Sequence, residues 1–132
     1  MRIHRGNKGQ SILELALLLP ILLLLLMGVF QFTLVLKSYM SLTLGSREGA
    51  RAGATGRTNA DIATLVTNRL PGFDTNRLTI TVTPSSEAAR HVGDYITVRV
   101  NYNQDLIMPV INTVIPDPLP MSSTTVMRIE SL

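Results

Sequence analysis

A single carboxylate, Glu14, stands at the front edge of a long apolar run. The next charged residue is Lys37, so residues 15–36 carry no charge. An ionised side chain inside a membrane segment is costly, which makes Glu14 a candidate functional residue that requires a partner. The chemistry open to it is charge pairing in a medium of low dielectric constant. The alternative is that Glu14 marks the edge of the membrane, where water among the lipid headgroups solvates it.

The other residue types that commonly do chemistry form no recognisable constellation. The two histidines, His4 and His91, are isolated, and two isolated histidines do not make a metal site. Ser85 and Ser86 lie near His91, but no acid stands at a spacing typical of a catalytic triad. Residues 45–56 are rich in glycine but lack the Lys-Ser or Lys-Thr ending of a phosphate-binding loop. There is no cysteine, so we expect no disulfide framework and no thiol chemistry. Because no polar groups converge in the sequence, we expect no enzyme, no metal site and no cofactor.

A basic head and the apolar run together predict a membrane anchor. Residues 1–9 contain Arg2, Arg5 and Lys8, and the remaining basic and acidic residues are equal in number. The net charge of +3 is therefore local to the head, which indicates no nucleic-acid-binding face and keeps the N-terminus in the cytoplasm. As a helix, residues 15–36 span about 33 Å, enough to cross a hydrocarbon core of about 30 Å. A cleaved secretory signal is the alternative, but its apolar core is shorter and an A-x-A-like site would follow.

The helix is expected to continue past Lys37 as a stalk. Pro20 predicts a kink inside the membrane segment, where helices tolerate proline. Gly45, Gly49 and Gly53 recur every four residues, so they share one helix face and allow another backbone to approach closely. The sequence leaves open whether that backbone belongs to this chain or to another subunit, or whether the small residues let the stalk fray.

On the other side of the stalk, charged residues predict a weak ion pair. Glu48 and Arg51 are three residues apart, the spacing of neighbours on a helix surface. Exposed pairs of this kind contribute little to stability.

The distal part of the chain predicts a small domain. Thr58 or Asn59 is expected to cap a second helix that ends at Pro71-Gly72. Its apolar stripe is Ile62, Leu65, Val66 and Leu70. Alternating apolar and polar residues predict antiparallel strands over 78–83, 95–102 and 123–129. The proline-rich residues 105–120 predict a long irregular loop with at most one helical turn.

The predicted fold class is α+β. It combines a long N-terminal transmembrane helix that extends into a stalk, a short second helix and an antiparallel sheet of about three strands. The predicted boundaries are a basic leader over 1–9, the helix over 10–56 and an extracytoplasmic domain over 57–132.

Three pieces of the chain resemble one family. They are G-Q-S-I-L-E-L-A-L-L-L-P at 9–20, S-R-E-G-A-R-A-G-A at 46–54 and M-R-I-E at 127–130. The first looks like the class III signal of type IV pilins and pseudopilins, with Leu15 where this family often has an aromatic residue. Together the pieces resemble the TadE-like pseudopilins, or minor pilins, of the tight-adherence (Tad/Flp) pilus system.

The resemblance implies how the chain is processed. A prepilin peptidase on the cytoplasmic face would cut after Gly9 and leave Gln10 as the new N-terminus, with Glu14 as the fifth mature residue. The implied location is the bacterial inner membrane, with the C-terminal domain outside the cytoplasm or in an extracellular pilus. The implied partners are other pilin or pseudopilin subunits, the inner-membrane assembly platform and membrane lipid.

Two functions therefore follow from the sequence. In the first, Glu14 pairs with the Gln10 amine of a neighbouring subunit and sets its register during assembly of an adhesive pilus. In the second, the helix only tethers a generic extracytoplasmic binding domain to the membrane.

Overall fold

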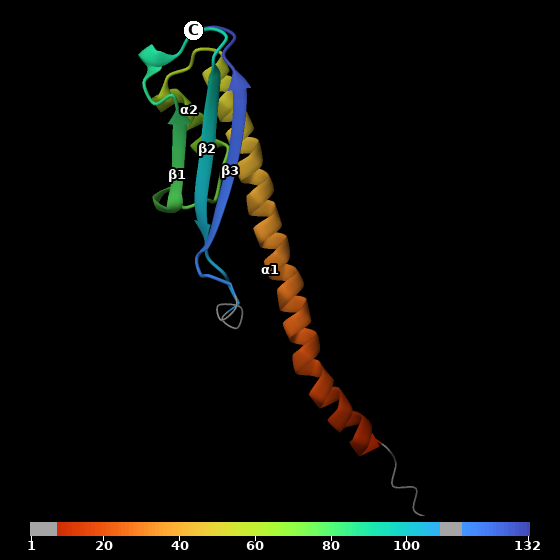
Figure 1. The fold of residues 1–132 in the computed structure, drawn as a ribbon. Helices are drawn as coiled ribbons and strands as arrows, with labels where there is room; N and C mark the ends of the chain where they lie inside the picture. The colour runs from red at the N-terminus through yellow and green to blue at the C-terminus, as the bar shows by residue number, and fades with distance from the viewer. Residues whose placement is uncertain (1–7, 109–114) are drawn as a thin grey trace, which may run out of the picture.

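The molecule is built along one helix, as the computed structural model shows (Figure 1). The structure describes residues 8–108 and 115–132. Helix α1 runs from Lys8 to Ala54 and continues through Pro20. Its 47 residues correspond to about 70 Å at about 1.5 Å per residue. The first half stands free, and the second half carries the rest of the chain.

Helix α1 begins inside the predicted leader over 1–9, because Lys8 and Gly9 are already helical. The predicted head charges Arg2 and Arg5, like His4, lie outside the described residues.

Helix α2, Asn59–Asn68, is capped by Thr58, which decides between the two predicted caps. The Thr58 hydroxyl accepts a hydrogen bond of 3.1 Å from the amide N–H of Asp61, and so satisfies one of the free donors at the helix start. The predicted stripe is confirmed, since Ile62 and Val66 are fully buried.

Three antiparallel strands form the sheet in the order β1-β2-β3. They are β1 Leu78–Thr83, β2 Tyr95–Gln104 and β3 Leu119–Arg128. Short 3-10 turns at Thr75–Arg77 and Glu87–Ala89 precede β1 and β2. The predicted α+β class with a small antiparallel sheet is thus confirmed.

Strand β3 begins earlier than the sequence predicted. It starts at Leu119 instead of Ser123 and includes Pro120, which lies opposite Asn103 of β2. A proline is tolerated there because β3 is an edge strand, so the missing N–H breaks no interior ladder. The described parts of the predicted loop contain no helical turn, and Pro109 lies outside the described residues.

The core lies between one face of the sheet and the two helices. Every second residue of β2 is buried, as its alternation predicted: Ile96, Val98, Val100 and Tyr102. They pack on the distal half of α1 and on α2, which lies behind the sheet (Figure 1).

The C-terminal residues close over the end of α1. Ile129 is 1% exposed, and the N–H groups of Glu130 and Ser131 donate to the Ala54 carbonyl at 2.8 and 3.2 Å. Gly56, with φ of +81°, turns the chain directly after the helix. The helix end is thereby locked to the sheet.

Candidate functional site: the N-terminal helix

The predicted processing and pairing residues lie in the first turns of α1. Gly9, Gln10 and Glu14 are all exposed, and Gln10 and Glu14 stand one helical turn apart on the same face. No side chain that the structure describes lies within ion-pair distance of the Glu14 carboxylate. In the isolated chain this carboxylate is therefore available to a partner.

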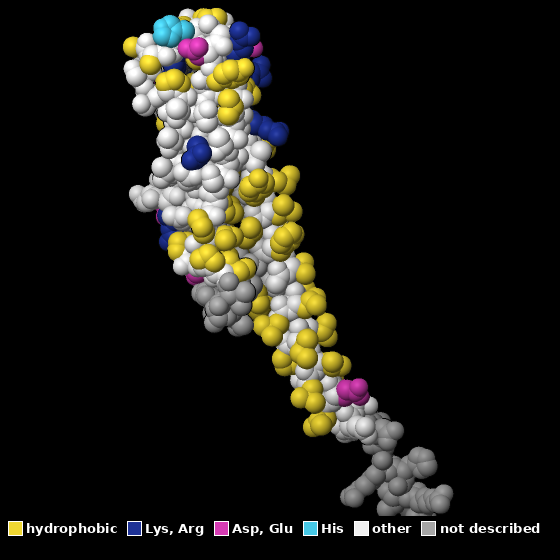
Figure 2. Space-filling model, in the orientation of Figure 1, with side chains coloured by type: hydrophobic (Ala, Val, Ile, Leu, Met, Phe, Trp, Pro, Cys, Tyr) yellow, Lys and Arg dark blue, Asp and Glu magenta, His cyan; other side chains and the backbone are white. Residues whose placement is uncertain are grey.

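The segment that follows Glu14 exposes its apolar side chains on every side. Hydrophobic side chains cover the free part of α1 (Figure 2), and the large ones from Ile12 to Met27 are between 46% and 68% exposed. A helix that is apolar all round must be buried in a membrane or against other helices. The helix fits a membrane anchor: its apolar window has a mean hydropathy of 2.7 and no burial within the chain.

The glycine stripe faces the chain's own domain. Gly45, Gly49 and Gly53 are buried. A Cβ on Gly49 would lie 2.7 Å from Val66 Cγ2, and one on Gly53 would overlap Ile96 Cδ1. At Gly45 the nearest atom, Val66 Cγ1, is 3.5 Å away, an ordinary contact. The stripe therefore lets α2 and β2 approach α1 within one subunit.

Beside the stripe, a buried group of hydroxyls joins α1 to β3. The Ser46 side chain is fully buried, and its Oγ lies 3.0 Å from Ser123 Oγ and 2.9 Å from Thr125 Oγ1. Its Oγ also bonds the Thr43 carbonyl oxygen at 3.0 Å. Sequence reasoning missed this group; its only signal was serine and threonine on the inward face of the last strand.

Replacing Ser46 with alanine should destabilise the domain by about 1–3 kcal/mol, because the buried Ser123 hydroxyl and the half-buried Thr125 hydroxyl would lose a partner. Ser41→Ala is the matched control. Within the described residues its hydroxyl bonds only the Lys37 carbonyl, in an exposed hydrogen bond, and surface changes stay within about 0.5 kcal/mol. Urea unfolding of the full chain in mild detergent measures both. Equal stabilities for the two variants would contradict a structural role for the hydroxyl group.

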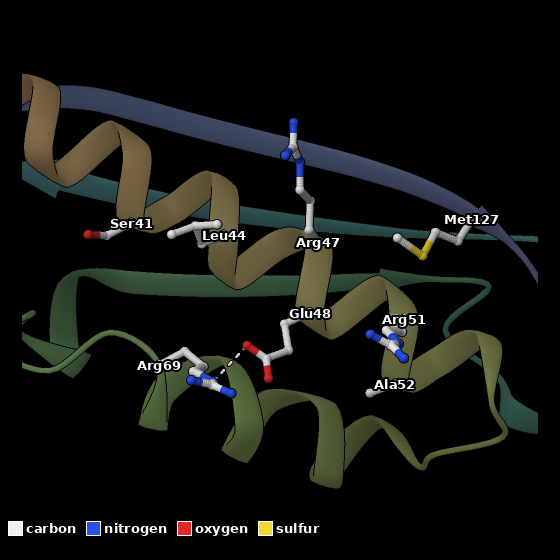
Figure 3. A pocket seen from close by; sticks show the side chains of 8 residues that line it. All are labelled: Ser41, Leu44, Arg47, Glu48, Arg51, Ala52, Arg69 and Met127. Atoms are coloured by element: carbon white, nitrogen blue, oxygen red, sulfur yellow. Dashed lines mark ion pairs between the residues drawn. The ribbon is translucent and has the colours of Figure 1, made fainter.

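The predicted Glu48–Arg51 ion pair is wrong. Glu48 pairs instead with Arg69, with 2.6 Å between Oε2 and Nε. Figure 3 shows the carboxylate turned toward α2, because Arg69 at the C-terminal cap of that helix reaches across the gap. Both side chains are partly exposed, so the pair contributes at most about 1 kcal/mol.

Several other polar residues, including the sequence candidates His91 and Ser85, make surface interactions. His91 Nδ1 lies 3.4 Å from Asp94 Oδ2, with both side chains more than half exposed, and Ser85 contributes only its carbonyl, to Asn59. Arg77 pairs with Asp74 and Asp105, and the hydrogen bond to Asp105 raises the pKa of the guanidinium. Among the described residues no group of three His, Cys, Asp or Glu side chains could hold a metal ion.

These features define a class: an α+β protein in which one long apolar helix, whose length and composition fit a membrane anchor, carries a small sheet on its distal half. The family model described as TadE-like protein matches residues 9–51. No curated protein and no solved structure matches the chain. The match confirms the resemblance to TadE-like proteins and supports, at the level of the family, a minor pilin associated with the Tad pilus.

Proposed function

We propose that this chain is a minor pilin that a prepilin peptidase cuts after Gly9 and that takes part in assembly of a Tad/Flp pilus at the inner membrane. The observation that carries the proposal is Glu14: a carboxylate without a described partner, at the front of a helix whose apolar surface is exposed on every side. The family match begins at the proposed cleavage position and supports the same interpretation.

Cleavage would create the missing partner. Hydrolysis of the Gly9–Gln10 peptide bond leaves a carboxylate on Gly9 and an amine on Gln10, and removes the basic head from the mature chain. An α-amine has an ordinary pKa of about 7.7–8.0, so at pH 7 it is mostly protonated. Gln10 and Glu14 are about 6 Å apart along the helix. A neighbouring subunit shifted by one turn therefore brings its amine to this carboxylate.

Pairing across subunits would set their register. Two charges in a low-dielectric medium repay their desolvation only if they meet with good geometry, and a misplaced subunit leaves one of them uncompensated. Glu14 is thus proposed as a register residue and not as a catalyst.

An apolar stripe on the stalk supports contact with another subunit. Leu36, Met40 and Leu44 recur every four residues and are 46%, 59% and 63% exposed. Two of them lie beyond Lys37, where a lipid hydrocarbon core no longer covers them. Apolar side chains aligned on one face fit a neighbouring helix.

The mature N-terminus tests the proposal. When the chain is produced together with a prepilin peptidase, N-terminal sequencing should start at Gln10, and Gly9→Val should leave the chain uncut. Gly28→Val is the matched control, because a Cβ at Gly9 or at Gly28 meets no atom within 4 Å. An intact Met1 terminus on pilus-associated protein would overturn the proposal.

A further inference from the structure

One face of α1 changes from apolar to basic along the stalk. Leu36, Met40 and Leu44 form its apolar part and are 46%, 59% and 63% exposed. Arg47 and Arg51, which are both exposed, continue the same face toward the end of the helix. At about 100° per residue, these side chains fall within an arc of about 80° around Met40. The apolar stripe therefore ends in two cations on one helix face.

The two cations have no counter-charge in the part of the chain that the structure describes. Glu48, the nearest carboxylate in the sequence, is bound to Arg69, and Figure 3 shows Arg47 on the opposite side of the helix from that pair. No described carboxylate lies within ion-pair distance of Arg47 or Arg51. The face is therefore open to an anionic partner.

A groove beside these arginines provides room for such a partner (Figure 3). Its volume is about 740 Å³, and it follows α1 from Ser41 to Ala52, with Met127 of β3 in its lining. Glu48 neutralises Arg69, so the two unpaired arginines leave the groove with an excess of positive charge.

A second copy of this chain fits the face poorly. Two parallel copies in register would join their apolar stripes but would also place Arg47 and Arg51 against the same residues of the other copy. Like charges brought together at an interface oppose association, and charged residues along a helix seam decide which helices pair. Helix α1 has only two carboxylates. Glu48 is already paired, and Glu14 lies about 50 Å from Arg47 along the helix.

We propose that the face from Leu36 to Arg51 binds a parallel helix of a different subunit. That helix presents apolar side chains opposite the stripe and carboxylates opposite Arg47 and Arg51. The partner is acidic because exposed guanidinium groups without a counter-charge form strong hydrogen bonds with carboxylates and are repelled by copies of themselves. It runs parallel because, in the proposed assembly, subunits share one orientation in the membrane.

The arginines thus select the partner, while the apolar stripe supplies the contact area. The inference rests on the proposed role of α1 in assembly, but not on cleavage after Gly9 or on pairing at Glu14. Its consequence is that this chain assembles with another subunit in preference to its own copies.

A charge-reversed copy of this chain supplies a probe with the chemistry of the partner. Arg47→Glu/Arg51→Glu keeps the apolar stripe and places carboxylates on the same face, and both positions are exposed, so the fold should be kept. The chain has no cysteine, so Met40→Cys in both copies reports contact at the centre of the face by disulfide formation. The full chains, of which one carries a larger tag, are mixed in mild detergent and oxidised, and their dimers are separated by size.

The mixed pair should form several-fold more disulfide dimer than either copy alone, and high salt should reduce this difference because it screens exposed charges. Tyr39→Cys is the matched control. Tyr39 is 52% exposed but lies about 100° from Met40 around the helix, so it should form little dimer in any mixture.

A neutral variant separates attraction from repulsion. Arg47→Gln/Arg51→Gln removes the like charges without adding carboxylates. It should therefore form more dimer with itself than the arginine copy does, and less than the mixed pair.

Two results would overturn the inference. Equal dimer formation by the mixed pair and by the arginine copy alone would make a second copy the occupant of this face. Absence of dimers from the mixed pair, with native near-ultraviolet circular dichroism, would show that a helix of the stated chemistry does not bind. The assay contains no peptidase and no other pilus component, so either failure leaves the test of cleavage at Gly9 unaffected.

Discussion

Glu14→Ala is expected to abolish pilus assembly and to leave membrane insertion intact. Alanine removes the only charge between the basic head and Lys37, so the apolar run becomes easier to insert. Assembly should fail because the Gln10 amine of a neighbouring subunit would be buried without a counter-charge. Breaking a buried ion pair by removing one partner costs about 3–5 kcal/mol, so the assembled fraction should fall by more than about a hundredfold.

Two further variants separate charge from shape at this position. Glu14→Gln keeps the size and hydrogen-bonding capacity but not the charge, and it should also fail to assemble. Leu18→Ala truncates an exposed side chain one turn further along the same face and should assemble. Membrane fractionation reports insertion and electron microscopy of shed material reports pili. Normal pili from Glu14→Ala would remove the role of this residue in register.

The sequence predicted correctly those helices and strands that are determined by residues close together in the chain. The uncharged run over 15–36 determines that α1 is long and apolar, and the structure has it as one helix. The cap at Thr58 and the spacing of Ile62 and Val66 define α2. Alternation of Ile96, Val98 and Val100 defines both the strand β2 and its buried face.

The features that were missed depend on contacts far apart in the chain. Glu48 pairs with Arg69 because the packing of α2 on α1 brings the two together, which the spacing to Arg51 does not reveal. Pro120 was assigned to a loop because its tolerance depends on β3 lying at the sheet edge. The 2.9 Å hydrogen bond from the N–H of Ile107 to Gln31 Oε1 joins the loop after β2 to helix α1. Neither residue carries a local signal for the other.

The glycine stripe was likewise predicted only in part from the sequence. A spacing of four predicted one face for Gly45, Gly49 and Gly53, but only the fold reveals that α2 and β2 occupy it and that the positions differ in clearance. At Gly49 the added Cβ would meet Val66 Cγ2 at 2.7 Å and Val98 Cγ1 at 3.1 Å. Both valines are fully buried and stiff at χ1, so the helix must move away to admit a methyl group.

Gly49→Ala should therefore be less stable than Gly45→Ala by about 1–3 kcal/mol, the usual effect of overpacking a core. Both substitutions replace glycine by alanine within α1, so both gain about 1 kcal/mol of helix propensity and the comparison cancels that gain. Gly45→Ala alone should stabilise the domain, because its Cβ meets Val66 Cγ1 at 3.5 Å, an ordinary contact.

Unfolding of the small domain must be followed separately from α1, because we expect the apolar helix to stay helical in detergent. Tyr102 serves as the probe: it is 8% exposed, and its ring packs edge-on against Phe73 at a centroid distance of 4.6 Å. Near-ultraviolet circular dichroism of the full chain during urea titration therefore reports loss of the sheet. If Gly49→Ala proved as stable as Gly45→Ala, the two valines would have room to shift, and the small residue at 49 would instead be required by a contact between subunits.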